Sequence, residues 1–211
     1  MDDLLRETQC ISSIRDVLED AASGKPFILV DGENRENEGD FIVLAEKVTP
    51  ESINFMITHG SGIVCLAMDQ SIADSLGLRL MDRSNVDDLY TAFATSIGAR
   101  YGIGTGVSAQ DRANTILAAV DKGATSSDIV TPGHVFPVIA KNGGVLERPG
   151  HTEGAVEIAK ILSATPAAAI CEAMNLDGTM SRLRDLIEFS QKYDIKITTM
   201  EKLIEYISQN Q

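Results

Sequence analysis

Tryptophan is absent from this 211-residue sequence, and basic residues, cysteine and histidine are scarce. The chain has 18 Lys and Arg residues against 31 Asp and Glu, which gives a formal net charge of -13. A surface with this excess of negative charge repels a phosphate backbone, so we predict no nucleic-acid partner. An anionic substrate would need local positive charge from arginine, a metal ion or a helix N-terminus.

Long hydrophobic segments are also missing. No apolar stretch reaches about 18 residues, so we expect no membrane-spanning helix and no membrane partner. The N-terminal segment MDDLLRETQC is acidic and lacks the apolar core of a signal peptide. The three cysteines, Cys10, Cys65 and Cys171, lack zinc-ligand spacing and are expected to be reduced, buried thiols. These features indicate a cytoplasmic protein.

The common catalytic signatures are not present either. No Ser/His/Asp or Cys/His signature appears, which disfavours nucleophilic catalysis. The glycine-rich segment GIGTGVS (102–108) has Val107 where a dinucleotide-binding motif has its last glycine, and it lacks the G-K-[ST] of a P-loop. As a turn onto a helix it can cradle a phosphate, but by itself this signal is weak.

Apolar runs alternate with helical patterns along the whole chain. Strands are predicted over residues 27–31, 41–46, 62–68, 90–99, 134–140, 167–174 and 196–199. Helices are predicted over residues 10–23 and 49–60, after Ser108, from about Thr152 to before Pro166, after Ser181 and from Thr198. This alternation favours an α/β fold, with α+β left open, and predicts a mixed sheet covered by helices. With no repeat or linker, we expect one domain over residues 1–211.

Some residues predict local structure. Ser108, Ser181 and Thr198 are each expected to cap the helix that follows, Thr198 in a capping box with Glu201. Pro137 lies within an apolar strand pattern and cannot donate to a sheet hydrogen bond. It therefore favours an edge or irregular position.

The first polar cluster is ENRENEGD (33–40), between two predicted buried strands. Such charge runs are usually solvated turns. Here, however, four carboxylates share one arginine, Arg35, and their repulsion needs something to neutralise it. Ligand sites collect at the ends of strands in α/β sheets, and oxygen-rich clusters suit hard divalent cations. The spacing is not that of an EF-hand loop.

A second cluster, RPGHTE (148–153), begins a predicted helix. Helix N-terminal amides attract anions, and Arg148 adds a bidentate phosphate donor. His151 can bind a metal as neutral imidazole. The alternative interpretation is an ordinary helix start with incidental polar residues.

Two further residues stand out within apolar strands. His134 is the first residue of the predicted strand HVFPVIA. A lone histidine in such a place is more often structural than catalytic. Glu172 lies in AAAICEAM, and a buried carboxylate is costly unless it is paired. Glu172 is therefore either half-exposed at a strand end or poised for proton transfer.

Six segments, in order from about residue 27 to about residue 182, carry a family resemblance. They are DGENRENEGDFIVLAE, INFMITHGSGIVCLAM, TAFATSI, TGVSAQDRANTI, PGHVFPVIAKNGGVLERPGHTEGAVEIAK and ICEAMNLDGTMSR. Together they resemble 3,4-dihydroxy-2-butanone 4-phosphate synthase, a lyase of riboflavin biosynthesis. The sequence departs from the family pattern at Gly98, where an acidic residue is usual, and residues 81–90 match no family segment.

The resemblance implies an α/β homodimer that uses Mg²⁺ or Mn²⁺, two ions per active site. Some family members carry a GTP cyclohydrolase II domain, which is not expected here. The implied metal ligands are Glu36 and His151, and the implied catalytic residues are His134, Glu172 and Asp40. The implied substrate-binding residues are Arg35, Glu36, Asp40, Thr105, Arg148, Pro149, Gly150, His151, Thr152 and Glu172.

The implied reaction converts D-ribulose 5-phosphate to L-3,4-dihydroxy-2-butanone 4-phosphate and formate. Metal polarisation of the C2 carbonyl would allow enediolate formation, followed by dehydration, skeletal rearrangement and formate loss. Two alternatives are kept: another metal-dependent sugar-phosphate aldolase or isomerase, and a non-catalytic cation-binding relative.

Overall fold

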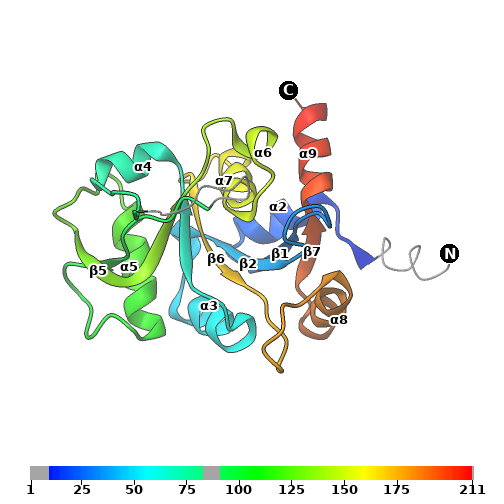
Figure 1. Cartoon of the computed structure of the whole chain (residues 1–211), viewed down its shortest axis with the longest axis horizontal. Helices are drawn as coiled ribbons and strands as arrows, with labels where there is room; N and C mark the ends of the chain where they lie inside the picture. The colour runs from blue at the N-terminus through cyan, green and yellow to red at the C-terminus, as the bar shows by residue number, and fades with distance from the viewer. Residues whose placement is uncertain (1–9, 83–90, 211) are drawn as a thin grey trace.

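The computed structural model describes residues 10–82 and 91–210, and its centre is a mixed β-sheet (Figure 1). The strands are β1 (Phe27–Val30), β2 (Gly39–Leu44), β3 (Cys65–Met68), β4 (Ile97–Ala99), β5 (Ile129–Ile139), β6 (Ala167–Glu172) and β7 (Lys196–Thr199). They are arranged in the order β4-β5-β3-β6-β2-β1-β7. The β1–β7 and β3–β5 pairs are parallel, and the other pairs are antiparallel.

Helices cover both faces of this sheet. The helices are α2 (Ile14–Ala22), α3 (Pro50–Phe55), α4 (Gln70–Ser75), α5 (Ala109–Val120), α6 (Gly144–Glu147), α7 (His151–Ile161), α8 (Leu183–Tyr193) and α9 (Met200–Gln209), with a 3-10 turn at Ala45–Lys47 and a π-turn at Met56–Gly60. In Figure 1, α2, α7 and α9 lie on one face, and α3, α5 and α8 lie on the other. The predicted α/β fold, with a mixed sheet covered by helices, is confirmed. Each helix in the described part of the chain is too short or too polar to span a bilayer.

Two cores result from the alternation of side chains along the strands. On β2, Phe41 and Val43 join the core under α3, α5 and α8, whereas Ile42 and Leu44 join the core under α7. Because both faces are covered, the central strands read in sequence as unbroken apolar runs.

The ends of β2 and β6 carry two of the side chains that the sequence predicts to be catalytic. Asp40 on β2 lies opposite Glu172 on β6 in the antiparallel register. Since side chains two residues apart share a face, both carboxylates lie on the face that α7 covers. The sheet therefore places Asp40 and Glu172 side by side, near the start of α7.

The helix starts are only partly as predicted. Ser108 caps α5 and accepts the N–H of Asp111 at 3.0 Å, as expected. The prediction for Ser181 is wrong, because Arg182 is the N-cap of α8 and the hydroxyl of Ser181 donates to Asn175 at 2.9 Å. The prediction for Thr198 is also wrong. Thr198 is buried at the end of β7, and Thr199 caps α9 instead.

Pro137 does not lie on an edge strand, because β5 is flanked by β4 and β3. The carbonyl of Pro137 accepts the N–H of Ala94 at 2.9 Å. On that side the pairing is irregular, an isolated bridge between Phe93 and Val138, so a missing donor is tolerated. Among the cysteines, Cys65 and Cys171 are buried free thiols as predicted, whereas Cys10 is partly exposed.

The apolar docking of α9 gives a prediction about stability. Leu203 is fully buried in the core that α9 shares with α7, so Leu203→Ala should lower the free energy of unfolding by about 2–5 kcal/mol. Glu205→Ala, at an exposed position of the same helix, should change it by less than about 0.5 kcal/mol. Urea denaturation of both variants measures this. Equal effects would show that α9 is not docked through Leu203.

Candidate metal and substrate site

The loop between β1 and β2 is organised around Asp31. The buried carboxylate of Asp31 accepts the backbone N–H groups of Glu36 at 3.3 Å and Glu38 at 2.8 Å. Arg35 donates to Asp31 at 2.5 Å and to the carboxylate of Glu36 at 2.9 Å. The predicted acidic cluster is thus a structured loop whose side chains and amides are bonded to one another.

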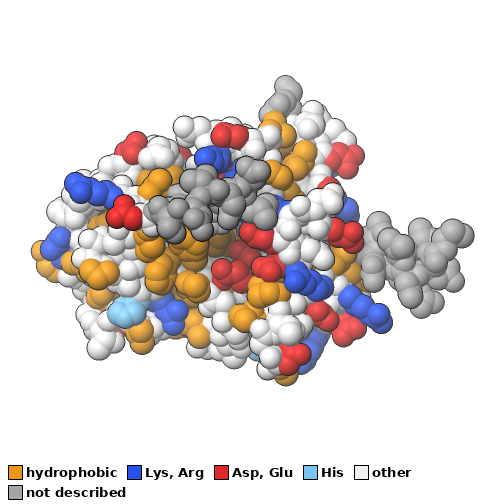
Figure 2. All heavy atoms as spheres, viewed as in Figure 1, with side chains coloured by type: hydrophobic (Ala, Val, Ile, Leu, Met, Phe, Trp, Pro, Cys, Tyr) orange, Lys and Arg blue, Asp and Glu red, His pale blue; other side chains and the backbone are white. Residues whose placement is uncertain are grey.

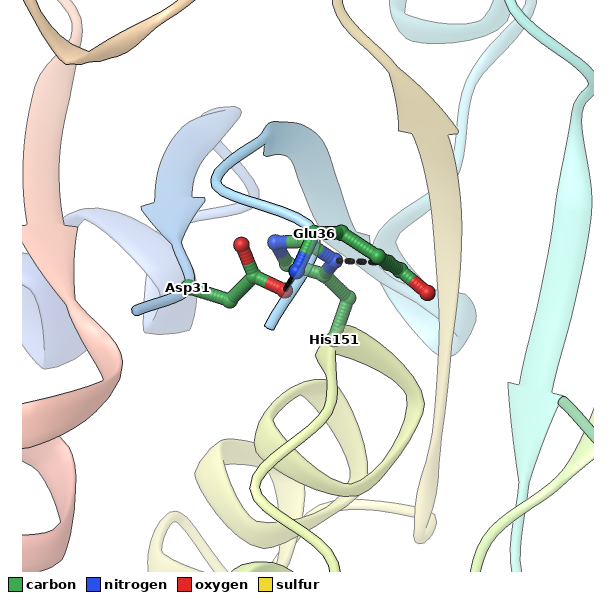
Figure 3. Close-up of side chains that lie close together, drawn as sticks. All are labelled: Asp31, Glu36 and His151. Carbon is green, nitrogen blue, oxygen red and sulfur yellow. Dashed lines mark hydrogen bonds and ion pairs between the residues drawn. The ribbon is translucent and has the colours of Figure 1, made fainter. Parts of the chain in front are cut away.

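His151 faces this loop from the first residue of α7. Its Nδ1 lies 3.9 Å from Oε2 of Glu36 and 3.7 Å from Oδ1 of Asp40. Asp31, Glu36 and His151 each offer a ligand atom, and these atoms lie within 4.8 Å of one another (Figure 3). The predicted ligands Glu36 and His151 are therefore brought together, with Asp31 as a third candidate.

The state of His151 suits a metal ligand. Burial lowers the pKa of its imidazole, so the neutral form, which can bind a metal, is favoured at neutral pH. A backbone hydrogen bond to Glu38 opposes this shift but does not reverse it. Nε2 is buried without a hydrogen bond of good geometry among the described residues, and Nδ1 faces Glu36 and Asp40, so a ring nitrogen is available to a divalent cation held with Glu36.

Asp40 and Glu172 form a carboxylate pair beside this cluster. Burial first, and then the charge of Glu172, raise the pKa of Asp40 well above its ordinary value. Glu172 is only partly buried, and its Oε2 accepts the N–H of Ile63 at 2.8 Å. A Cβ on Gly62 would lie 2.4 Å from that same oxygen, so glycine is required where the chain passes Glu172.

The start of α7 combines a buried ion pair with uncapped amides. Arg148 is buried and bonds to Glu153 at 2.6 Å and to the hydroxyl of Thr91 at 3.1 Å. Its guanidinium passes close over Gly150, where a Cβ would lie 2.2 Å from one nitrogen. Gly150 is the N-cap and has no side chain to bond the first-turn amides, so these remain suited to an anion. Thr152 is buried in this first turn.

His134 and Thr105 lie apart from the acidic cluster. Both are exposed, and they lie near each other, since a Cβ on Gly106 would be 2.8 Å from Nδ1 of His134. β3 lies between β5 and β6, and Cys65 pairs with Phe136 on one side and with Ile170 on the other. His134 and Glu172 each lie two residues further along their strands, towards the same end and on the same face of the sheet. With strands about 4.8 Å apart, they are separated by about 10 Å.

Several residues of this site were not assigned a role from the sequence. In the sequence, Asp31 is the last residue of a predicted apolar strand. Its position at a strand end beside the acidic loop was the feature that could have indicated a role in the site. Glu153 was visible in the RPGHTE cluster, but nothing in the sequence showed that it pairs with Arg148. Figure 2 shows acidic side chains gathered in a recess near the middle of one face, beside a hydrophobic band.

The thiols do not provide an alternative centre. Burial, followed by the charge of Glu172, raises the pKa of Cys171 to about 12. The pKa of Cys65 is raised well above its ordinary value for the same reasons. Neither residue is therefore a thiolate at neutral pH, in line with the absence of a nucleophile signature.

Comparison with known proteins relates this arrangement to one family. The family model described as 3,4-dihydroxy-2-butanone 4-phosphate synthase matches residues 15–206. A riboflavin biosynthesis protein RibBA of Bacillus mycoides (strain KBAB4) is 52% identical over 193 residues, which are 92% of this chain and 48% of the relative. A 3,4-dihydroxy-2-butanone 4-phosphate synthase of Neisseria meningitidis serogroup A is 49% identical over 201 residues, 95% of this chain and 55% of the relative. The chain thus spans about half the length of these curated relatives.

Solved structures agree with the sequence comparisons. RibBX, a two-domain 3,4-dihydroxy-2-butanone 4-phosphate synthase from A. baumannii, is 44% identical with a TM-score of 0.91, over 95% of this chain and 59% of that one. A 3,4-dihydroxy-2-butanone 4-phosphate synthase in complex with two magnesium ions is 33% identical with a TM-score of 0.89, over 94% of this chain and 98% of that one. On the evidence of fold, site and sequence together, this chain belongs to the 3,4-dihydroxy-2-butanone 4-phosphate synthase family.

Proposed function

We propose that this protein converts D-ribulose 5-phosphate to L-3,4-dihydroxy-2-butanone 4-phosphate and formate in riboflavin biosynthesis. The observation that carries the proposal is the meeting of Asp31, Glu36 and His151 beside the Asp40–Glu172 pair and the start of α7. Family membership supports the same substrate and reaction. The reaction needs no external oxidant or net water, because the substrate contains all the atoms of both products.

A divalent cation is part of the proposal. Glu36 and His151 would hold it, with Asp31 within reach, and Mg²⁺ and Mn²⁺ both suit one imidazole and carboxylate oxygens. A relative described in complex with two magnesium ions supports two ions per site. When bound, such ions polarise the C2 carbonyl of the substrate and stabilise negative charge beside it.

The start of α7 would bind the phosphate. Its first-turn amides are uncapped, and Arg148 and Thr152 lie next to them. Pro149 and Gly150 shape this turn, and Gly150 leaves room for the guanidinium of Arg148. Fixing the phosphate here holds the sugar chain against the carboxylates, and this orientation lowers the barrier.

Protons would be moved by Asp40, Glu172 and His134, assisted by substrate contacts from Arg35 and Thr105. The first step removes the C3 proton. Later steps release the C1 hydroxyl as water, shift the carbon skeleton and add one water back to C4, which then departs as formate. Burial and the charge of Glu172 raise the pKa of Asp40, which favours its protonated form more than in an exposed aspartate, and an acid beside the carboxylate of Glu172 is the pairing that proton exchange needs.

We further propose a homodimer in which each site is shared. His134 and Thr105 are exposed and lie about two strands away from Glu172, so one protomer does not bring all the proposed groups into contact. Exposed apolar side chains near them, Ile63, Val107 and Val130, form a surface suited to a second copy. His134 and Thr105 of one protomer would then complete the site of its partner. A cytoplasmic location stays a prediction.

The first test is the reaction itself. The purified protein with ribulose 5-phosphate and Mg²⁺ should release formate, measured with a formate dehydrogenase assay. Excess EDTA should abolish release, and added Mg²⁺ should restore it. Consumption of the substrate without formate would instead favour an aldolase or isomerase, and metal binding without turnover would favour a non-catalytic relative.

The second test concerns the cation ligands. Glu36→Ala and His151→Ala should each weaken Mn²⁺ binding by about 10-fold or more, measured from the EPR signal of free Mn²⁺ without substrate. Glu33→Ala removes an equal charge from an exposed position of the same loop and should leave the affinity nearly unchanged. If all three variants behave alike, the ions are attracted by general charge and not held by these ligands.

The third test asks whether sites are shared. His134→Ala and Glu172→Ala should each lower turnover by about 100-fold or more in folded protein. When His134→Ala is mixed with Glu36→Ala, dissociated and reassembled, about one quarter of the wild-type activity should return, because half of the dimers then contain one intact site. Failure to recover activity, with mixed dimers shown by native mass spectrometry, would place both residues in the site of one protomer.

A further inference from the structure

Arg182 contacts the acidic loop from a distant part of the chain. A single guanidinium nitrogen of Arg182 donates to the carbonyl of Glu36 at 2.8 Å and to the carbonyl of Asn37. The same nitrogen lies 3.9 Å from the carboxylate of Glu38. We propose that Arg182 is a positioning residue that holds the backbone of this loop so that Glu36 faces His151. This inference rests on the proposed cation site.

The local backbone explains why such a contact is needed. Asn37 has a φ of 53°, in the left-handed region that asparagine adopts more readily than most residues other than glycine. In this conformation two successive carbonyls, those of Glu36 and Asn37, turn towards one donor. A charged donor forms a strong hydrogen bond to a carbonyl. Without Arg182, the turn at Asn37 would lose both of these bonds.

The position of Arg182 is itself fixed relative to the catalytic strands. Its N–H donates to Asp185 at 2.9 Å, which sets it as the N-cap of α8. Just before it, the N–H of Ser181 donates to the carbonyl of Ala173 at 3.0 Å, and the N–H of Ala173 donates to Gly39 at 2.9 Å. Hydrogen bonds therefore connect the segment that carries Arg182 to Ala173, next to Glu172, and through it to Gly39, next to Asp40. The pairing of β2 with β6 thus fixes where Arg182 meets the loop.

Because Arg182 is positively charged, its positioning role can be distinguished from a general electrostatic effect on cation binding. A positive side chain beside a cation site repels the cation, so electrostatics alone predicts that removing Arg182 strengthens cation binding. Positioning predicts the opposite, because Glu36 is released from its place beside His151. Residues that orient metal ligands typically change metal affinity by about 10–100-fold when they are removed.

The experiment is a Mn²⁺ titration followed by EPR, without substrate, on Arg182→Ala and Arg182→Lys. Arg182→Ala should bind Mn²⁺ about 10-fold more weakly, and Arg182→Lys should recover much of the affinity, because one charged nitrogen makes these contacts. The control is Arg184→Ala, which removes the same charge two residues away, where the side chain is 80% exposed and 4.0 Å from Glu188. Its affinity should stay within about 2-fold of wild type.

Hydrogen exchange gives a second reading that does not depend on a metal. In Arg182→Ala the amides of Glu36 and Glu38, which bond to Asp31, should exchange faster, while those of α8 beyond its first turn should not. Should this variant not fold, Arg182→Gln, which removes the charge, takes its place with the same expected result.

Mn²⁺ affinity equal to or tighter than that of wild type, or an equal loss in Arg184→Ala, would overturn the proposal. If Glu36→Ala leaves Mn²⁺ binding intact, the cation site fails, and the exchange rates still decide whether Arg182 holds the loop.

Discussion

The buried carboxylate of Asp31 carries the arrangement of the acidic loop. It accepts two backbone amides and the guanidinium of Arg35, so a segment rich in negative charge closes around another negative group. This works because hydrogen bonds from amides and arginine satisfy the carboxylate where water cannot reach it. Glu36, which also accepts from Arg35, and Asp40 lie 3.9 and 3.7 Å from Nδ1 of His151. A divalent cation at this place would relieve the repulsion between these carboxylates.

The sheet places the other groups by a rule of alternation. Asp40 and Glu172 lie on the α7 face because their neighbours two residues along, Ile42 and Ile170, pack under α7. α7 in turn presents His151 and its open amides at the same edge. The proposed acid–base groups, metal ligands and anion site thus meet through ordinary packing, although they come from segments far apart in the sequence.

Much of this arrangement was accessible from the sequence, because apolar runs covered on both faces are easy to recognise. The strands around the site were predicted close to their observed positions, and the family resemblance selected Glu36 and His151, which the fold brings together. Asp31 was not assigned, since a residue at the end of an apolar strand shows no sign of the amides it will accept. Arg182 was missed because its partners lie 146 and 145 residues away, and the cap was placed one residue early at Ser181. Long-range contacts of this kind leave no periodic pattern.

The direct opposition of Asp40 and Glu172 has a consequence for how this chain can change in length. Deleting one residue of β6 before Cys171 would move Cys171 towards the α7 face and turn Glu172 towards the opposite core, since side chains alternate. Insertions and deletions are therefore incompatible with β2 and β6 near the site. The turn after β6 is different: Asn175 and Thr179 close it by their own backbone bond, and Leu176 at its tip is fully exposed. Variation in length among working sequences should be confined to such tips, so the spacing of functional residues along the strands is as constrained as their identity.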